Sequence, residues 1–235
     1  MSETPTDAGP STSPSEPPRE RVSVPARALP GYLQRRYAAW RDGPFVESES
    51  WYRRLAEVGQ RPRAMLVSCC DSRVNAEQLF GAEPGELFVV RNVAALVPPH
   101  EPDQRHHGTS AAVEYAVMGL GVAHIVVVGH SSCGGVAACH AMCAGEAPEL
   151  DAPGSYIGRW TDLLRPGWER VRAEGRSGDP RALEQEAVIT SLANLMSFPF
   201  VAEAVEREAL TLHGAWIDIA SGRLEVLDGR RGVFA

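Results

Sequence analysis

Three short runs of apolar residues constrain the fold of this chain more than any other feature. They cover Ala64–Ser68, Leu87–Val90 and His124–Val128. Continuous apolar runs of this length are typical of strands that are buried on both faces of a parallel sheet. Between the last two runs, Thr109–Leu120 places small residues on one helical face. Strand, helix and strand in this order predict an α/β fold with parallel pairing and right-handed crossovers.

The rest of the chain is expected to surround this sheet with helices and to add a hairpin at its edge. Residues 1–28 are rich in Pro, Ser, Thr and Glu and nearly empty of large apolar side chains, so we expect a disordered tail. Residues 29–235 then form a single α/β domain, since 44% of the 235 residues are hydrophobic. Helical patterns occupy 30–42, 48–58, 136–144, 155–172 and 181–197, and the hairpin strands occupy 215–219 and 223–227.

Charge and apolar patterning argue against several classes of partner. The net charge is −7 and the 23 Lys and Arg residues are scattered, so we expect a small substrate and no nucleic acid. The chain has no run of about 18 apolar residues and no secretory signal pattern at its start, which predicts no membrane contact and a cytoplasmic location. Five cysteines without an export signal favour metal binding and buried thiols over a disulfide framework.

Two of the apolar runs end in residues that bind soft metal ions. Cys69 follows the first run, and His130 and Cys133 follow the third. Because loops at the carboxyl ends of parallel strands converge, these residues can reach one ion. Two thiolates and one imidazole suit zinc, and three protein ligands leave the fourth position open. Structural zinc sites use all four positions, so this pattern predicts a catalytic centre that binds and ionises water.

Asp71 and Arg73 add to this centre what a bare zinc site lacks. A carboxylate two residues beyond a ligand can accept a hydrogen bond from a zinc-bound water and orient it. Arg73 can hold that carboxylate by a bidentate pair and keep it ionised. The sequence therefore predicts an Asp71–Arg73 dyad beside the ion.

Three segments resemble the signature segments of the β-class carbonic anhydrases. They are VSCCDSRV at 67–74, GELFVVRNVA at 85–94 and VGHSSCGG at 128–135, and a looser similarity extends from about residue 32 to residue 228. The resemblance implies a β-carbonic-anhydrase-like fold, with a central four-stranded parallel sheet, an added antiparallel strand, flanking helices and an N-terminal helical arm. It also implies reversible hydration of carbon dioxide to bicarbonate by a homodimer or a larger homo-oligomer.

The resemblance assigns roles to single residues as well. One Zn²⁺ per subunit is bound by Cys69, His130 and Cys133, and Asp71 and Arg73 form the catalytic dyad. The substrate pocket maps onto Gln60, Phe88, Val93 and Tyr115, of which Phe88 and Val93 would enclose carbon dioxide and Gln60 would hydrogen-bond bicarbonate. Leu66 stands where one subgroup of the family has a tryptophan that is associated with an inhibitory bicarbonate site. The chain thus resembles the subgroup whose site is open at rest.

Two other functions are compatible with the same residues. A zinc hydrolase of carbonyl sulfide or carbon disulfide would use the same fold and ion with a different entrance. A non-catalytic zinc-binding relative is the second alternative. The presence of Asp71, Arg73 and Gln60 argues against it, because a structural zinc site has no use for the dyad.

A second His-x-x-Cys spacing, His140–Cys143, has to be separated from the first. It falls within a predicted helix, without a carboxylate or a glycine turn beside it, so we expect a packed or exposed helix face. Cys70 and Cys139 are expected to be structural. The remaining histidines singled out, His106, His107 and His213, are expected to be ordinary loop or structural residues.

Overall fold

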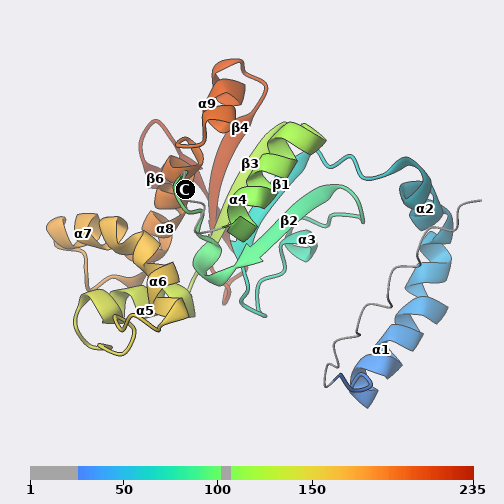
Figure 1. The fold of residues 1–235 in the computed structure, drawn as a ribbon, viewed down its shortest axis with the longest axis horizontal. Helices are drawn as coiled ribbons and strands as arrows, with labels where there is room; N and C mark the ends of the chain where they lie inside the picture. Colours follow the sequence, from blue (N-terminus) through green and yellow to red (C-terminus); the bar gives the residue numbers. More distant parts are fainter. Residues whose placement is uncertain (1–25, 102–106) are drawn as a thin grey trace, which may run out of the picture. The chain divides into compact units, whose positions relative to one another are not determined.

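The computed structural model describes residues 26–101 and 107–235, and the chain divides into two compact units (Figure 1). The first unit, Met1–Glu49, contains α1 (Gly31–Asp42) and the beginning of α2 (Pro44–Val58). Both helices were expected from the sequence, although α2 begins earlier than predicted, and neither contains a buried residue. Residues 1–25 of the predicted disordered tail lie outside the described residues.

The second unit, Ser50–Ala235, is built on a six-stranded mixed sheet in the order β2, β1, β3, β4, β5, β6. The strands are β1 Ala64–Cys69, β2 Leu87–Asn92, β3 His124–His130, β4 Thr211–Ile217, β5 Leu224–Asp228 and β6 Val233–Phe234. β2, β1, β3 and β4 pair in parallel, whereas β5 and β6 pair antiparallel. The predicted four-stranded parallel core with an added antiparallel strand is confirmed, and β6 is a further short strand that the sequence did not predict.

Helices flank this sheet. They are α3 Ala76–Leu79, α4 His107–Glu114, α5 Gly134–Cys143, α6 Tyr156–Thr161, α7 Arg165–Ala173, α8 Pro180–Leu195 and α9 Pro199–Glu206. The helix predicted at 109–120 continues beyond α4 as a π-helical segment, and α9 was not predicted. The single helix predicted at 155–172 is divided into α6 and α7 by a 3₁₀ turn. Pro166 stands in the first turn of α7, where its missing N–H is tolerated, but it cannot continue a preceding helix.

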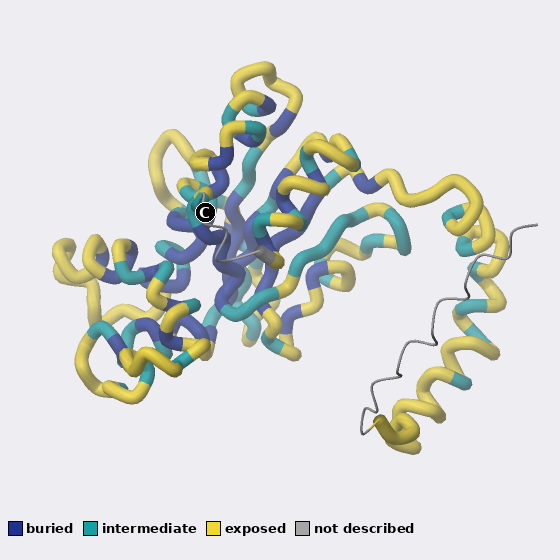
Figure 2. The backbone as a smooth tube through the Cα atoms, in the orientation of Figure 1, coloured by how far each residue is buried: buried dark blue, intermediate teal, exposed yellow. Residues whose placement is uncertain are grey.

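The central strands carry the core. β1 and β3 are buried along nearly their whole length, as two of the apolar runs predicted, and Figure 2 shows the buried backbone concentrated around them. β2 was expected to be equally buried but is only partly buried in the single chain, because it lies at the edge of the sheet. One core cluster packs β1 and β3 against α4, α8 and α9, and a second packs Cys69 and Cys133 against α5, α7 and α8. Among the described helices none alone is long and apolar enough to cross a membrane, although α8 and α9 meet that criterion as a pair bent by 89°.

Candidate metal centre

Two neighbouring strands and the start of a helix bring three metal-binding side chains together. Cys69 is the last residue of β1, His130 is the last residue of β3, and Cys133 directly precedes α5. Ser68 pairs with Val128 in the parallel register, so both strands end at the same edge of the sheet. The two sulfur atoms and a ring nitrogen lie within 4.8 Å of one another, and all three residues are buried. No other such group occurs in the part of the chain that the structure describes.

The loop around His130 fixes its tautomer. Nδ1 lies 2.9 Å from the carbonyl oxygen of Ser131, so the Nδ1–H donates, and Nε2 is the nitrogen whose lone pair is available when the ring is neutral. Nε2 is buried and has no hydrogen-bond partner. A buried ring nitrogen without a partner is unfavourable unless a ligand uses its lone pair. A metal ion is the ligand that this geometry fits, because metal-bound histidines commonly donate their other N–H to a carbonyl.

The two thiols behave as one acid pair. Their Sγ atoms are 3.9 Å apart, and the hydrogen bond from Cys133 lowers the pKa of Cys69 to about 4, although burial opposes this shift. His130 and the backbone N–H groups of Asp71 and Ala94 act in the same direction as Cys133. The contact with Cys69, together with burial, raises the pKa of Cys133. Cys69 is thus the more acidic thiol of the pair, and a soft dication between the two sulfur atoms would replace their protons.

Tight backbone packing fixes the position of Cys133. Ser132 has a φ of 56°, a left-handed conformation that is uncommon outside glycine and persists only where the surrounding structure holds it. In the following turn, a Cβ on Gly135 would lie 2.5 Å from Cγ1 of Val93 and 3.0 Å from Cβ of Ala94. Only glycine therefore fits where α5 starts against the segment after β2.

Asp71 and Arg73 form a pair beside the ligand loops. Nε of Arg73 donates to Oδ1 of Asp71 at 2.9 Å, and Nη2 donates to Oδ2 at 2.7 Å. Nη2 also donates to the carbonyl oxygen of Ser132 at 3.0 Å, which ties the first ligand loop to the second. The side-chain hydrogen bonds from Arg73 hold the pKa of Asp71 well below its usual range. Asp71 is therefore ionised at neutral pH and can only accept hydrogen bonds.

Arg91 braces the same loop and was not assigned a role from the sequence. Its Nε donates to the carbonyl oxygen of Cys69 at 2.9 Å. Its Nη2 donates to the carbonyl oxygens of Asp71 at 2.8 Å and Val74 at 2.7 Å. One guanidinium thus holds three backbone carbonyls around the first ligand. The only sequence signal was its place within the second segment that resembles the family.

Glu184 is a second residue that sequence reasoning missed. Its Oε1 accepts a hydrogen bond from the backbone N–H of Cys133 at 3.3 Å, and its Oε2 accepts one from Nε1 of Trp216 at 3.2 Å. The side chain belongs to α8 and is only 5% exposed, and this burial raises its pKa. Glu184 therefore anchors the second ligand loop from the helix behind it.

Cys69, His130 and Cys133 are called the metal group below. Val93 is the one predicted substrate-pocket residue that lies beside this group within a single copy of the chain. It contacts the start of α5 at Gly135 and packs against the cluster that contains Cys69 and Cys133. Its carbonyl oxygen accepts a hydrogen bond of 2.8 Å from Nε1 of Trp160.

The other three predicted pocket residues lie elsewhere in the same copy. Phe88 pairs with Met65 near the beginning of β1 and contacts Tyr115, with ring centroids 5.8 Å apart. Gln60 precedes β1 and lines a separate cavity of about 450 Å³. Cys69 ends β1, and a six-residue strand advances by roughly 17 Å from its first to its last residue. One copy of the chain therefore does not bring Gln60, Phe88 and Tyr115 to the metal group.

The second His-x-x-Cys spacing takes no part in this group. Nδ1 of His140 lies 3.4 Å from Nε1 of Trp168, which donates to it, and Sγ of Cys143 lies 4.0 Å from Sγ of Cys139 inside α5. Cys70 was expected to be a structural, buried thiol but is exposed, because it lies just beyond the end of β1. Nε2 of His213 lies 3.2 Å from Nδ1 of His124 on the neighbouring strand. His106 lies outside the described residues, and His107 begins α4.

Comparisons with known proteins agree with this arrangement. The family described as carbonic anhydrase matches residues 64–224, a range that contains the metal group and the dyad. A carbonic anhydrase of Pseudomonas aeruginosa is 42% identical over 171 residues, which cover 72% of this chain and 75% of that protein. Among solved structures, the β-carbonic anhydrase CcaA has a TM-score of 0.78 at 27% identity and covers 88% of this chain and 92% of its own. A tetrameric β-carbonic anhydrase of Sordaria macrospora has a TM-score of 0.67 at 28% identity, with coverages of 84% and 95%.

Proposed function

Because the chain belongs to the carbonic anhydrase family, and within it to the β class, we propose that it hydrates carbon dioxide reversibly to bicarbonate with one zinc ion per subunit. The observation that carries this proposal is the buried group of two thiols and one imidazole with an ionised carboxylate in the adjoining loop. Three donors leave a coordination position for water, which is the arrangement of catalytic rather than structural zinc sites.

Cys69, His130 and Cys133 would hold the zinc ion. The unpartnered Nε2 of His130 and the lowered pKa of the Cys69 thiol support this assignment, since both atoms can offer a lone pair to a metal ion. When bound, zinc lowers the pKa of its water to about 7, which makes a nucleophile available at neutral pH.

Asp71 would orient the reacting water. As an obligate acceptor, its carboxylate would accept a hydrogen bond from that water and so keep an oxygen lone pair directed at carbon dioxide. Arg73 holds the carboxylate through two parallel hydrogen bonds and links it to Ser132. Val93 forms an apolar wall beside the ligand loops, which suits a non-polar substrate.

Gln60, Phe88 and Tyr115 would complete the substrate pocket from a second copy of the chain. Their distance from Cys69 within one copy supports this, as does the position of Phe88 on β2, the strand at the edge of the sheet. Tyr115 is 52% exposed in the single chain. The tetrameric state of the Sordaria macrospora relative further supports association.

Mixed oligomers test this shared pocket. Gln60→Ala and Asp71→Asn should each reduce turnover, and co-assembled chains of the two variants should regain activity, because one pocket then combines an intact Asp71 with an intact Gln60. No recovery on co-assembly would show that both residues act within the same copy.

Metal analysis and stopped-flow hydration of carbon dioxide test the proposed reaction itself. The native chain and Cys143→Ala should each bind one zinc per subunit and hydrate carbon dioxide, whereas Cys133→Ala should lose both zinc and activity. Cys143→Ala is the matched control because it removes the thiol at the end of α5, the helix that Cys133 precedes, and Cys143 does not belong to the metal group. Equal zinc loss in both variants would show that His130 and Cys133 are not the pair that binds the metal in preference to His140 and Cys143. Bound zinc with negligible hydration, but rapid hydrolysis of carbonyl sulfide, would replace the proposed substrate.

A further inference from the structure

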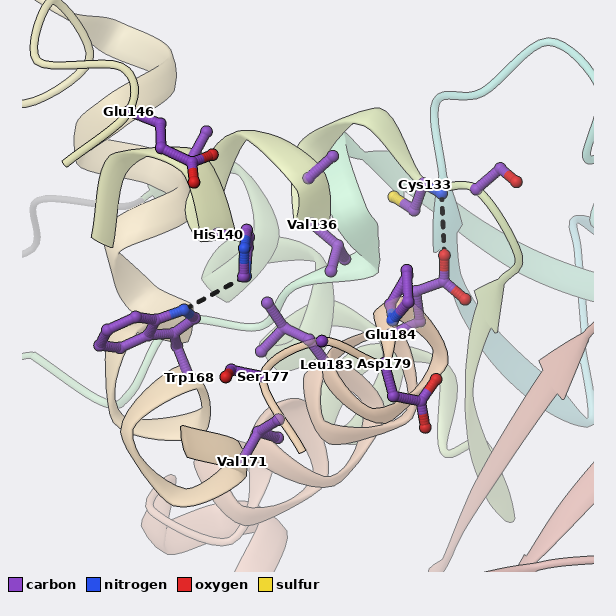
Figure 3. A pocket seen from close by; sticks show the side chains of 15 residues that line it. Cys133, Val136, His140, Glu146, Trp168, Val171, Ser177, Asp179, Leu183 and Glu184 are labelled. Atoms are coloured by element: carbon purple, nitrogen blue, oxygen red, sulfur yellow. Dashed lines mark hydrogen bonds between the residues drawn. The ribbon is translucent and has the colours of Figure 1, made fainter. Parts of the chain in front are cut away.

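A cavity of about 620 Å³ lies behind Cys133, between α5, α7 and α8 (Figure 3). Its wall includes Ser132 and Cys133 of the second ligand loop but not Cys69, His130 or Asp71. The cavity borders the metal centre without forming part of it, and the proposed hydration reaction does not use it. Its volume falls within the range of about 300–1,000 Å³ that is typical of small-molecule sites.

Much of the cavity wall is apolar. Val136 of α5, Trp168 and Val171 of α7 and Leu183 of α8 contribute to this wall (Figure 3). The Trp168 ring is held by the hydrogen bond from its Nε1 to Nδ1 of His140. A ligand that fills this space must therefore carry an apolar body, because a fully hydrated ion would leave these side chains in contact with water.

The charged residues of the wall are all acidic. Glu146, Asp179 and Glu184 line the cavity, and no Lys or Arg does. Glu184 is only 5% exposed, and its two oxygens accept hydrogen bonds from neutral N–H groups. Asp179 has the guanidinium of Arg176 at 3.6 Å, but no described cation lies within ion-pair distance of Glu146 or Glu184. Glu146 and Asp179 are exposed and Glu184 is buried, so all the charged groups around the cavity give it a negative potential, which favours a positively charged ligand.

The placement of these carboxylates distinguishes between kinds of cation. A compact metal ion needs three or more donor atoms close together, and in the described ranges only the group at Cys69, His130 and Cys133 provides them. The acidic groups instead lie around an apolar wall. We infer that this cavity binds a small organic cation, a primary ammonium attached to one aromatic ring or a body of similar size. The ammonium donates hydrogen bonds to the carboxylates, and the ring covers the apolar side chains.

Calorimetric titration of the zinc-loaded full chain with 2-phenylethylammonium at pH 7.5 tests this inference. The matched probes are 2-phenylethanol, which has the same shape without the charge, and phenylacetate, which has the opposite charge. The ammonium should bind once per chain and at least about tenfold more tightly than the alcohol, since a charged hydrogen bond is stronger than a neutral one. Phenylacetate should not bind in this cavity. Equal affinity for the alcohol and the ammonium, or no binding of the ammonium, would overturn the inference.

Two variants locate the bound probe. Ala137 is an exposed residue of α5 that lines the cavity, so Ala137→Phe should fill it and weaken ammonium binding by at least about tenfold. Ala144→Phe adds the same ring at the end of the same helix outside the cavity and should leave binding unchanged. A crystal structure with the probe gives an independent readout. Unchanged binding in Ala137→Phe, or density for the probe at the metal group, would assign the ammonium to another site.

Discussion

Replacing Gly135 by alanine should weaken zinc binding by displacing Cys133. The added Cβ would lie 2.5 Å from Cγ1 of Val93, 3.0 Å from Cβ of Ala94 and 3.3 Å from N of Ala94. Carbon atoms in ordinary contact are about 3.5–4.0 Å apart, so the shortest of these contacts is too close by at least about 1 Å. Ala94 is buried and already has a φ of 65°, so its backbone cannot withdraw easily. The start of α5 must move instead, and Cys133 directly precedes it.

The size of the expected loss in zinc affinity follows from the strain that the extra methyl group causes. An extra methyl group in a filled site destabilises by about 1–3 kcal/mol. Zinc requires sulfur at about 2.3 Å in tetrahedral geometry, so displacement of Cys133 reduces the affinity for zinc. Each 1.4 kcal/mol is a factor of ten, which gives a loss of roughly 5- to 150-fold. If part of the strain is already present without zinc, the Tm of the metal-free protein should also fall, by about 2–4 °C for each kcal/mol.

Competition with a chromophoric zinc chelator at neutral pH measures this change, and differential scanning calorimetry of the metal-free protein measures the stability. Gly134→Ala is the control, because it adds the same methyl group one residue earlier, where no atom lies within 4 Å of the new Cβ. Gly134→Ala should keep the native zinc affinity. If Gly135→Ala binds zinc as tightly as Gly134→Ala does, the contact with Val93 does not position the ligand loop.

The dyad gives two further predictions. Asp71→Asn should lower kcat/KM for hydration by about 10²- to 10³-fold while zinc content stays the same, because an amide no longer acts only as an acceptor. Stopped-flow rates with metal analysis measure both quantities. Unchanged turnover would show that the carboxylate takes no part in the mechanism. Arg73→Gln should destabilise the fold in a pH-dependent way. Arg73 depresses the pKa of Asp71 in the folded state, so the pair stabilises above the unfolded pKa of about 3.9 and this contribution is lost as pH falls through the folded pKa. The difference in Tm between the native chain and Arg73→Gln should therefore be largest near neutral pH and shrink below about pH 4; a difference that is constant with pH would contradict the ion pair as its cause.

Local sequence patterns were sufficient for the parallel core and for the metal group. The apolar runs mark β1 and β3 because central strands of a parallel sheet are buried on both faces, and the ligands stand at the ends of those runs. α9 was not predicted, because its eight residues are too few for a clear helical pattern; Pro199 at its start is a residue suited to the first turn of a helix. β6 has only two residues, which is too short to produce an alternating pattern.

The supporting residues of the site could not be predicted in the same way. Arg91 reads as an ordinary charged residue on a strand, and its function depends on carbonyls in a loop about 20 residues earlier in the chain. Glu184 lies four residues before Val188 and so on the apolar side of α8, but nothing in the sequence indicates that its carboxylate accepts the N–H of Cys133. Gln60 could be assigned only through the resemblance, because nothing local indicates on which side of a subunit boundary it acts.

The proposed zinc ion could be bound only after ligands that lie far apart along the chain have been brought together. Cys69 and Cys133 meet only after β1 and β3 have paired, and β3 emerges from the ribosome long after β1. Bringing distant residues together costs conformational entropy before the stabilising contacts between them form. The nascent chain therefore passes through a period in which no complete ligand set exists. During that period Cys69 and Cys133 lack the burial that they have in the folded chain. Supplying zinc only after translation should therefore give as much active protein as supplying it throughout, provided that reducing conditions are maintained until the sheet has formed.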